Sequence, residues 1–151
     1  MCELAISSGA DAVKFQLYQA NELVNPLISP DRHTHFSGFQ LDREQHVALA
    51  ERCRSAGVAY MASVWDQPML TWIDPYLDAY KVGSGDLTAR SLVRELARRG
   101  KPLLISTGLS TLDEVRAAVE DVRRTNPTYH QEGMITLLQC SSVYPLDEGE
   151  A

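Results

Sequence analysis

The sequence predicts an α/β fold in which short parallel strands alternate with amphipathic helices. Stretches of mostly apolar residues recur along the chain, and helix-like segments that end near a glycine separate them. Short continuous apolar runs are typical of buried parallel strands, and their alternation with helices is typical of βα units. The five expected strands cover residues 12–17, 58–63, 79–82, 102–106 and 134–140.

The first long helix has clear start and stop signals. Asp42 followed three residues later by Gln45 is a capping-box pattern, and Gly57 stands where a left-handed residue commonly ends a helix. This pattern predicts a helix between the first two strands. Its buried face is expected to carry Val47, Leu49 and Ala50.

The remaining helices follow the same logic. Thr111 and Glu114 repeat the capping-box pattern before an apolar stripe at helical spacing. Another helix is expected to begin at Thr88, and shorter ones are expected over residues 1–8 and 67–73. Every pair of neighbouring strands is therefore expected to be connected by helical structure.

The stretch from residue 18 to residue 40 has no clear period, and it is expected to form a long irregular loop of functional importance. It contains His33 and His35, while His46 and His130 are expected on a helix surface or in a loop. His33 and His35 have no cysteine or glutamate near them at metal-ligand spacing. We therefore expect no metal site within this chain.

Composition excludes several classes of partner. The net charge is −6 and the isoelectric point is about 5.1, so nucleic acid and anionic membranes are unfavourable partners. No apolar run is long enough to span a bilayer. Cys2, Cys53 and Cys140 are widely spaced and match no metal or redox motif, so we expect a protein of the reducing cytoplasm.

Polar residues follow each expected strand, where active sites of parallel α/β proteins lie. Lys14 and Lys81 are strand lysines, and a buried ammonium needs a carboxylate or an anionic ligand. An internal ion pair with a residue such as Asp86 is one reading of Lys14. Because two strands each supply a lysine, we favour an anion site. Hydroxyls near it come from Ser63, Ser84, Ser106, Thr107, Ser141, Ser142 and Tyr144.

Four segments in order resemble the sialic acid synthase family. They are residues 9–16 (GADAVKFQ), 80–87 (YKVGSGDL), 100–108 (GKPLLISTG) and 137–145 (LLQCSSVYP). The resemblance spans nearly the whole chain and corresponds to strands two to six of the family. It implies a partial (β/α)8 TIM barrel with about five parallel strands.

The same resemblance implies an activity and a set of site residues. The family condenses phosphoenolpyruvate with an N-acetylmannosamine-like amino sugar to give a sialic (nonulosonic) acid and phosphate. By resemblance Lys14, Lys81 and Tyr144 are the expected catalytic residues. The expected substrate-binding residues are Gln16, Ser63, Ser84, Asp86, Ser106 and Ser142, of which Gln16 and Asp86, with Tyr144, are expected nearest the sugar.

The resemblance also predicts what residues 1–151 do not contain. They are expected to form an incomplete barrel domain that lacks the first strand, the last two strands and the C-terminal domain. The full-length family enzyme uses a divalent metal, Mn or Mg, whose ligands are expected outside this chain. It is also expected to be a homodimer. Which amino sugar is used is not given by the sequence.

Two alternatives stay open at this stage. The first is a Schiff-base aldolase in which Lys81 attacks a keto acid. The second is a catalytically silent fragment, or a subunit that pairs with another chain.

Overall fold

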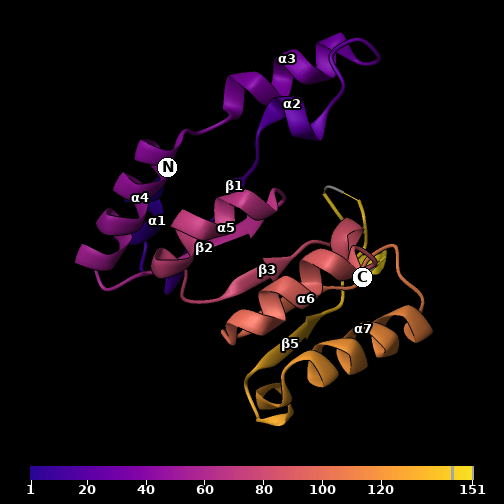
Figure 1. Cartoon of the computed structure of the whole chain (residues 1–151). Helices are drawn as coiled ribbons and strands as arrows, with labels where there is room; N and C mark the ends of the chain where they lie inside the picture. Colours follow the sequence, from indigo (N-terminus) through magenta and orange to yellow (C-terminus); the bar gives the residue numbers. More distant parts are fainter. Residues whose placement is uncertain (144, 151) are drawn as a thin grey trace. The chain divides into compact units, whose positions relative to one another are not determined.

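The computed structural model describes residues 1–143 and 145–150. It divides into two compact units, Met1–Asp78 and Ala79–Ala151, each of which is described by itself. Within each unit the strands are parallel and alternate with helices, so the expected α/β fold is confirmed. The elements can be followed along the chain in Figure 1. In the part of the chain that the structure describes, no helix is both long and apolar enough to cross a bilayer.

The first unit is built on two parallel strands. Strand β1 (Ala12–Leu17) pairs with β2 (Ala59–Val64) in a register that sets Gln16 opposite Ser63. The other elements are α1 (Cys2–Ser7), α2 (Ala20–Leu23), α3 (Pro30–Phe39), α4 (Arg43–Ser55), η1 (Gln67–Met69), α5 (Leu70–Ile73) and η2 (Asp74–Tyr76).

Helix α4 begins and ends as the sequence predicts. Asp42 Oδ1 accepts a hydrogen bond from the Gln45 amide at 2.7 Å, and Gln45 Oε1 accepts one from the Asp42 amide at 2.9 Å. Gly57 has a φ of 69°, a conformation that costs glycine little because it has no β-carbon. The predicted capping box is therefore confirmed.

The buried face of α4 agrees with the prediction at Ala50 but not at Val47 and Leu49, which are only half-buried. The residues that α4 buries are His46, Ala50 and Cys53, which follow one another at helical spacing. His46 is fully buried, so its expected place on a surface or in a loop is wrong. Its ring lies against Phe15, at a centroid distance of 6.5 Å, and its Nδ1 lies 2.6 Å from the Tyr60 hydroxyl.

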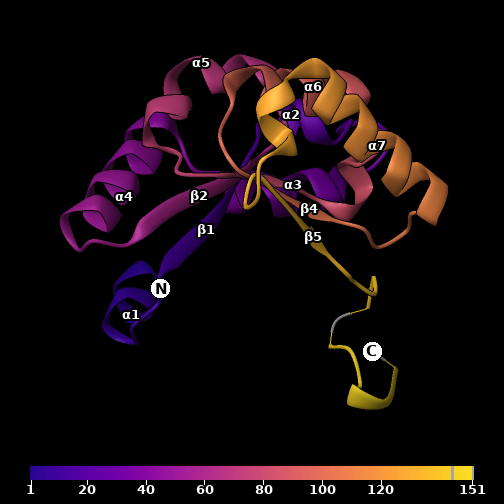
Figure 2. The same cartoon turned by 90° about the horizontal axis from the view of Figure 1, so that it is seen from below.

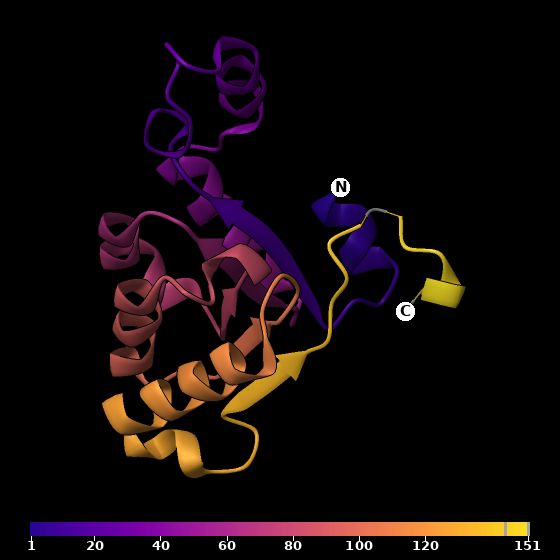
Figure 3. The ribbon, with the colours of Figure 1, turned by 90° about the vertical axis from the view of Figure 1, so that its right-hand side faces the viewer.

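The long irregular loop expected between residues 18 and 40 is also wrong, because α2 and α3 lie there. Figure 3 shows this helix pair beyond the C-terminal end of β1. None of the ten residues that the structure describes in α3 is buried. Contacts to the chain on either side hold the pair: the Tyr18 hydroxyl donates to the Phe36 carbonyl at 3.0 Å, and Gln40 Oε1 accepts from the Ala20 amide at 2.7 Å.

The second unit contains three parallel strands. Strand β4 (Leu103–Ser106) lies between β3 (Tyr80–Val82) and β5 (Ile135–Leu138). The other elements are η3 (Ser84–Asp86), α6 (Arg90–Arg99), α7 (Leu112–Thr125), η4 (Pro127–His130) and η5 (Glu148–Glu150). Figure 2 shows α6 and α7 side by side.

Helices α6 and α7 are joined by a bidentate ion pair. Arg94 Nε donates to Asp121 Oδ2 at 2.6 Å, and Arg94 Nη2 donates to Asp121 Oδ1 at 2.9 Å. These bonds lower the pKa of the Asp121 carboxyl. The predicted capping box of Thr111 is present, but α6 begins at Arg90 rather than at Thr88.

Candidate active site

In the first unit, alternation along β1 separates a packed face from an open one. Phe15 stacks on Tyr60 at a centroid distance of 5.6 Å and so faces the side that α4 covers. Successive side chains of a strand point to opposite faces, which places Lys14 and Gln16 on the other side. Both of these side chains are exposed within the first unit, whereas Ser63, opposite Gln16, is buried.

Lys14 and Gln16 line an open groove of about 350 Å³. The groove is completed by Phe15, Tyr18, Phe39 and Leu41, so helix α3 and the residues that follow it supply an apolar wall beside a polar floor. Sequence reasoning missed this role of Phe39 because residues 18–40 were expected to have no regular structure. The groove lies along the C-terminal half of β1, toward the strand end where a ligand of a parallel α/β protein is expected.

The ammonium of Lys14 is available to a ligand. Within the described ranges, 1–143 and 145–150, no hydrogen bond or ion pair reaches its Nζ. The surrounding protein removes part of the water around this ammonium, and this desolvation lowers the pKa of Lys14. An ammonium that is partly desolvated and has no partner among the described residues gains from binding an anion.

In the second unit, Lys81 is fixed by two acceptors at the end of β3. Its Nζ donates to Ser106 Oγ at 2.6 Å and to the Val82 carbonyl oxygen at 2.7 Å. Ser106 is the last residue of β4, and its side chain is buried. The register sets Lys81 opposite Leu104, so the ammonium reaches forward along β4 to the strand end. The structure therefore brings two of the expected site residues together.

Two further serines surround Gly108, just after β4. A β-carbon at position 108 would lie 2.9 Å from Ser84 Oγ, 3.0 Å from Ser142 Oγ and 3.0 Å from the Cys140 carbonyl oxygen. Real β-carbons almost never approach other atoms so closely, so only glycine fits without a shift. Gly108 thus allows hydroxyls from two loops to converge. In the sequence, Gly108 is recognisable only as the last residue of the segment 100–108.

Asp86 is directed back toward its own turn. Its Oδ2 accepts a hydrogen bond from the Gly83 amide at 3.2 Å. This bond holds the turn that carries Ser84 after strand β3. The position of Tyr144, the remaining expected site residue, lies outside the described residues.

The described residues do not offer a metal centre. In the described part of the chain, no group of three or more histidine, cysteine, aspartate or glutamate residues is arranged to hold an ion. His33 Nε2 lies 2.7 Å from Asn21 Oδ1, and the His35 ring packs against Phe36 and Phe39. These contacts give both rings a structural role on α3.

A second cavity of about 300 Å³ lies at the start of β2. Arg54, Gly57, Tyr76 and Asp78 are among the residues that line it. It is at the N-terminal end of the strand, whereas ligands of parallel α/β proteins bind at the C-terminal ends. We therefore do not assign it to the candidate active site.

Two curated relatives align with nearly all of the chain. It is 33% identical over 156 aligned positions to the N,N'-diacetyllegionaminic acid synthase of Legionella pneumophila, with 93% of the chain and 43% of that protein covered. It is 26% identical over 165 positions to the N-acetylneuraminate-9-phosphate synthase of Mus musculus, with 100% of the chain and 44% of that protein covered. The chain thus spans less than half the length of these two relatives.

A solved structure has the same fold. The N-acetylneuraminic acid (sialic acid) synthetase of Leptospira borgpetersenii, determined in complex with citrate, matches with a TM-score of 0.87 at 23% sequence identity. The match covers 100% of the present chain and 50% of that one. A model of the NeuB family matches residues 1–151, the whole length of the sequence. The chain therefore belongs to the NeuB family.

Proposed function

We propose that this chain supplies phosphoenolpyruvate-binding and sugar-binding residues to a nonulosonic acid synthase. The observation that carries the proposal is the cluster in the second unit, where Lys81 bonds to Ser106 and the hydroxyls of Ser84 and Ser142 converge on Gly108. A fixed ammonium among several hydroxyls is suited to a ligand that carries both a carboxylate and a phosphate. Membership of the NeuB family supports this choice of anion.

The proposed reaction joins two substrates. The C3 carbon of phosphoenolpyruvate forms a bond to the aldehyde carbon of an open-chain N-acetylated amino sugar, whose aldehyde oxygen takes up a proton. Water then adds to C2, and the C2–O bond to phosphate breaks. The two curated relatives are synthases of N-acetylated sugar acids, which supports an acetylated substrate.

Each unit contributes its own site residues in this proposal. In the second unit Lys81 and the serines hold the charged groups of phosphoenolpyruvate, and Asp86 lies near the sugar. In the first unit Lys14 and Ser63 contribute to anion binding, and Gln16 contacts the sugar across the groove that Phe39 borders. Tyr144 is assigned to the reacting groups by family resemblance alone. The divalent ion that the family implies would take its ligands from outside this chain.

The three lysines of the chain give a matched test. Lys14→Met and Lys81→Met each remove an ammonium from the candidate site, whereas Lys101→Met removes one that lies 5.9 Å from the Tyr80 ring centroid, before β4. Loss of a charged hydrogen bond weakens binding by roughly 1.5–3 kcal/mol, or about 10- to 150-fold in Kd. We expect this loss of phosphoenolpyruvate affinity in titration calorimetry for the first two variants and not for the third.

Two calorimetric results would contradict the proposed anion site. Phosphoenolpyruvate affinity unchanged by Lys81→Met, or reduced as much by Lys101→Met, would contradict the assignment of the anion site. Circular dichroism spectra of all three variants would establish that each keeps its fold.

The Schiff-base alternative is tested separately with borohydride. The amine of an aldolase must be free to attack a carbonyl, but Lys81 Nζ donates hydrogen bonds to Ser106 and to the Val82 carbonyl. We expect pyruvate plus borohydride to leave Lys81 unmodified in peptide mass spectra. A reduced pyruvate adduct on Lys81 would favour the aldolase.

A further inference from the structure

Two cysteines that are far apart in the sequence meet in the first unit. Cys2 of α1 and Cys53 of α4 are separated by 51 residues, yet their sulfurs lie 3.7 Å apart. Both side chains are buried, with Cys53 fully inaccessible. A disulfide bond is about 2.05 Å long, so the two sulfurs need to approach by only about 1.7 Å to be joined.

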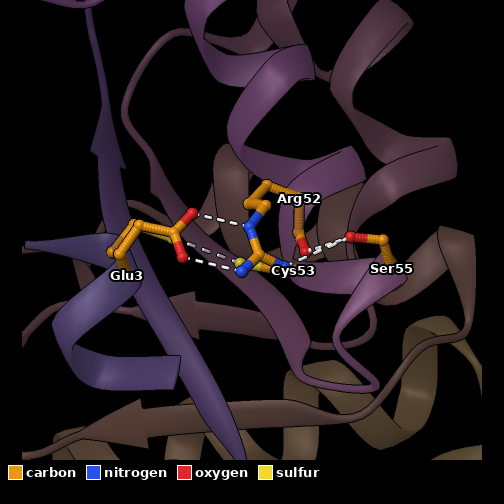
Figure 4. Close-up of polar contacts among 5 residues, drawn as sticks. Glu3, Arg52, Cys53 and Ser55 are labelled. Carbon is orange, nitrogen blue, oxygen red and sulfur yellow. Dashed lines mark hydrogen bonds and ion pairs between the residues drawn. The ribbon is translucent and has the colours of Figure 1, made fainter. Parts of the chain in front are cut away.

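The neighbours of the two cysteines hold the helices in register. Glu3 follows Cys2 and Arg52 precedes Cys53, and these two charged side chains form a bidentate ion pair, shown in Figure 4. Arg52 Nε donates to Glu3 Oε1 at 2.6 Å, and Arg52 Nη2 donates to Glu3 Oε2 at 2.7 Å. The ion pair therefore fixes α1 on α4 directly beside the thiols.

Among the described residues, α1 buries little apolar surface apart from Cys2. Of the six described residues of this helix, Cys2 is buried and the other five are not. Segments that bury few apolar groups open locally at low free-energy cost, without unfolding of the whole domain. Opening of α1 would separate the Cys2 sulfur from Cys53 and expose it, and closing would bring the two sulfurs back into contact.

We propose that Cys2 and Cys53 form a site for reversible oxidation, at which a small disulfide such as oxidised glutathione creates an intramolecular disulfide that ties α1 to α4. The proposal does not depend on the reaction that the enzyme catalyses. The contact between α1 and α4 could not be expected from the sequence, because the wide spacing of the cysteines along the chain does not show it.

The exchange proceeds in two balanced steps. One cysteine thiolate attacks a sulfur of oxidised glutathione, breaks its disulfide and releases one glutathione thiolate. The second cysteine then attacks the mixed disulfide and releases the other glutathione. In total the two cysteines lose two protons and two electrons, and oxidised glutathione becomes two molecules of reduced glutathione.

The geometry sets the order of the two steps. Burial, together with the contact to Cys2, raises the pKa of Cys53 to about 11, which disfavours the reactive thiolate. Cys53 is also the less accessible of the two thiols. Cys2 is therefore the first to react, and Cys53 completes the bond once the mixed disulfide holds its target sulfur beside it.

The disulfide would close a covalent loop around much of the first unit. Strand β1, helices α2 and α3 and all residues that line the groove beside Lys14 lie between Cys2 and Cys53 in the sequence. Oxidation would thus restrain the segment that forms this groove.

The test uses peptide mass spectrometry. The reduced protein is incubated with oxidised glutathione, free thiols are blocked with iodoacetamide, and peptides are analysed without reduction. We expect a peptide that links Cys2 to Cys53, an intact mass lower by two hydrogens for this bond, and recovery of both thiols with dithiothreitol. Cys140→Ser should leave the cross-link in place. Cys53→Ser should stop the reaction at a glutathione adduct on Cys2.

A rate measurement tests the gating by α1. Glu3→Gln breaks the ion pair and should speed the formation of the cross-link by up to about fivefold, the range expected for an exposed ion pair. Asp113→Asn is the matched control, because it removes one carboxylate from the exposed pair with Arg116 in the second unit. The control should leave the rate unchanged.

Three outcomes would overturn the proposal. Separate glutathione adducts on Cys2 and Cys53 without a link would show that the sulfurs do not reach bonding distance. Links that involve Cys140 in place of the 2–53 bond would point to intermolecular oxidation. Oxidation seen only in denaturant would show that α1 does not open in the folded protein.

Discussion

The buried pair of His46 and Tyr60 makes a specific prediction about stability. His46 Nδ1 lies 2.6 Å from the Tyr60 hydroxyl, and both residues are almost completely inaccessible. The other ring nitrogen, Nε2, has no hydrogen-bond partner among the described residues. Tyr60→Phe would leave the whole imidazole without a partner. A buried polar group in that state costs about 1–3 kcal/mol.

Urea unfolding followed by tryptophan fluorescence measures this loss. The Trp72 ring lies 6.3 Å from the His46 ring, so its emission reports on this part of the first unit. With a typical urea m-value of about 2 kcal/mol per molar, the midpoint of Tyr60→Phe should fall by about 1 M. The double variant Tyr60→Phe, His46→Leu should recover part of that loss, because both polar partners are then replaced by apolar groups.

The same pair predicts how stability changes with pH. Burial lowers the pKa of His46, although nearby Asp42 opposes this shift. A histidine in the unfolded chain has a pKa of about 6.5, so below that pH the unfolded state binds a proton that the folded state does not. The free energy of unfolding should therefore fall as the pH drops below about 6.5, and the loss should level off below the folded pKa.

His46→Leu should remove this part of the pH dependence. His130→Gln, which changes an exposed histidine of the second unit, is the matched control. A Tyr60→Phe variant as stable as the unsubstituted protein would refute the hydrogen-bond argument. An undiminished loss of stability between pH 7 and 5.5 in His46→Leu would refute the assignment of that loss to His46.

Three other predictions follow from particular contacts. Gly108→Ala should weaken phosphoenolpyruvate binding by roughly tenfold or more in calorimetry while circular dichroism stays unchanged, because a methyl group would displace the hydroxyls around it; normal affinity would contradict the proposed cluster. Thr111→Ala should lower the free energy of unfolding by about 1 kcal/mol through loss of the α7 cap, and equal urea midpoints would argue against it. The Cys2–Cys53 disulfide should stabilise the folded protein by about 4 kcal/mol in the chain-entropy model, so an oxidised form with the melting temperature of the reduced one would be unexpected.

The sequence predicts best the helices whose ends are marked by residues close together in the chain. The capping boxes at Asp42 and Thr111 are recognisable because their partners lie three residues away. Helix α3 could not be predicted in this way, because none of its described residues is buried and it therefore has no apolar stripe. His46 was misplaced because a histidine at a buried helical position has the same local pattern as one on the surface.

The candidate site was predictable to the extent that it follows strand ends. The contact of Lys81 with Ser106 follows from two neighbouring parallel strands, because Lys81 of β3 lies beside β4, whose last residue is Ser106. Gly108 lies close to Ser84, Cys140 and Ser142, which belong to other segments of the chain. The sequence spacing of these residues does not predict that they lie so close together. The contact of Cys2 with Cys53 has the same origin, since it depends on how α1 lies against α4.

Helix α3 borders a groove but contributes none of its described residues to the core. Because it buries none of its described residues, substitutions along it should change the free energy of unfolding very little. Yet its last residue, Phe39, borders the groove whose floor carries Lys14 and Gln16. Selection can therefore alter the wall of this groove without altering the core of the first unit. Exchanging residues 30–39 between members of the family would therefore change the wall of this groove while the fold is kept.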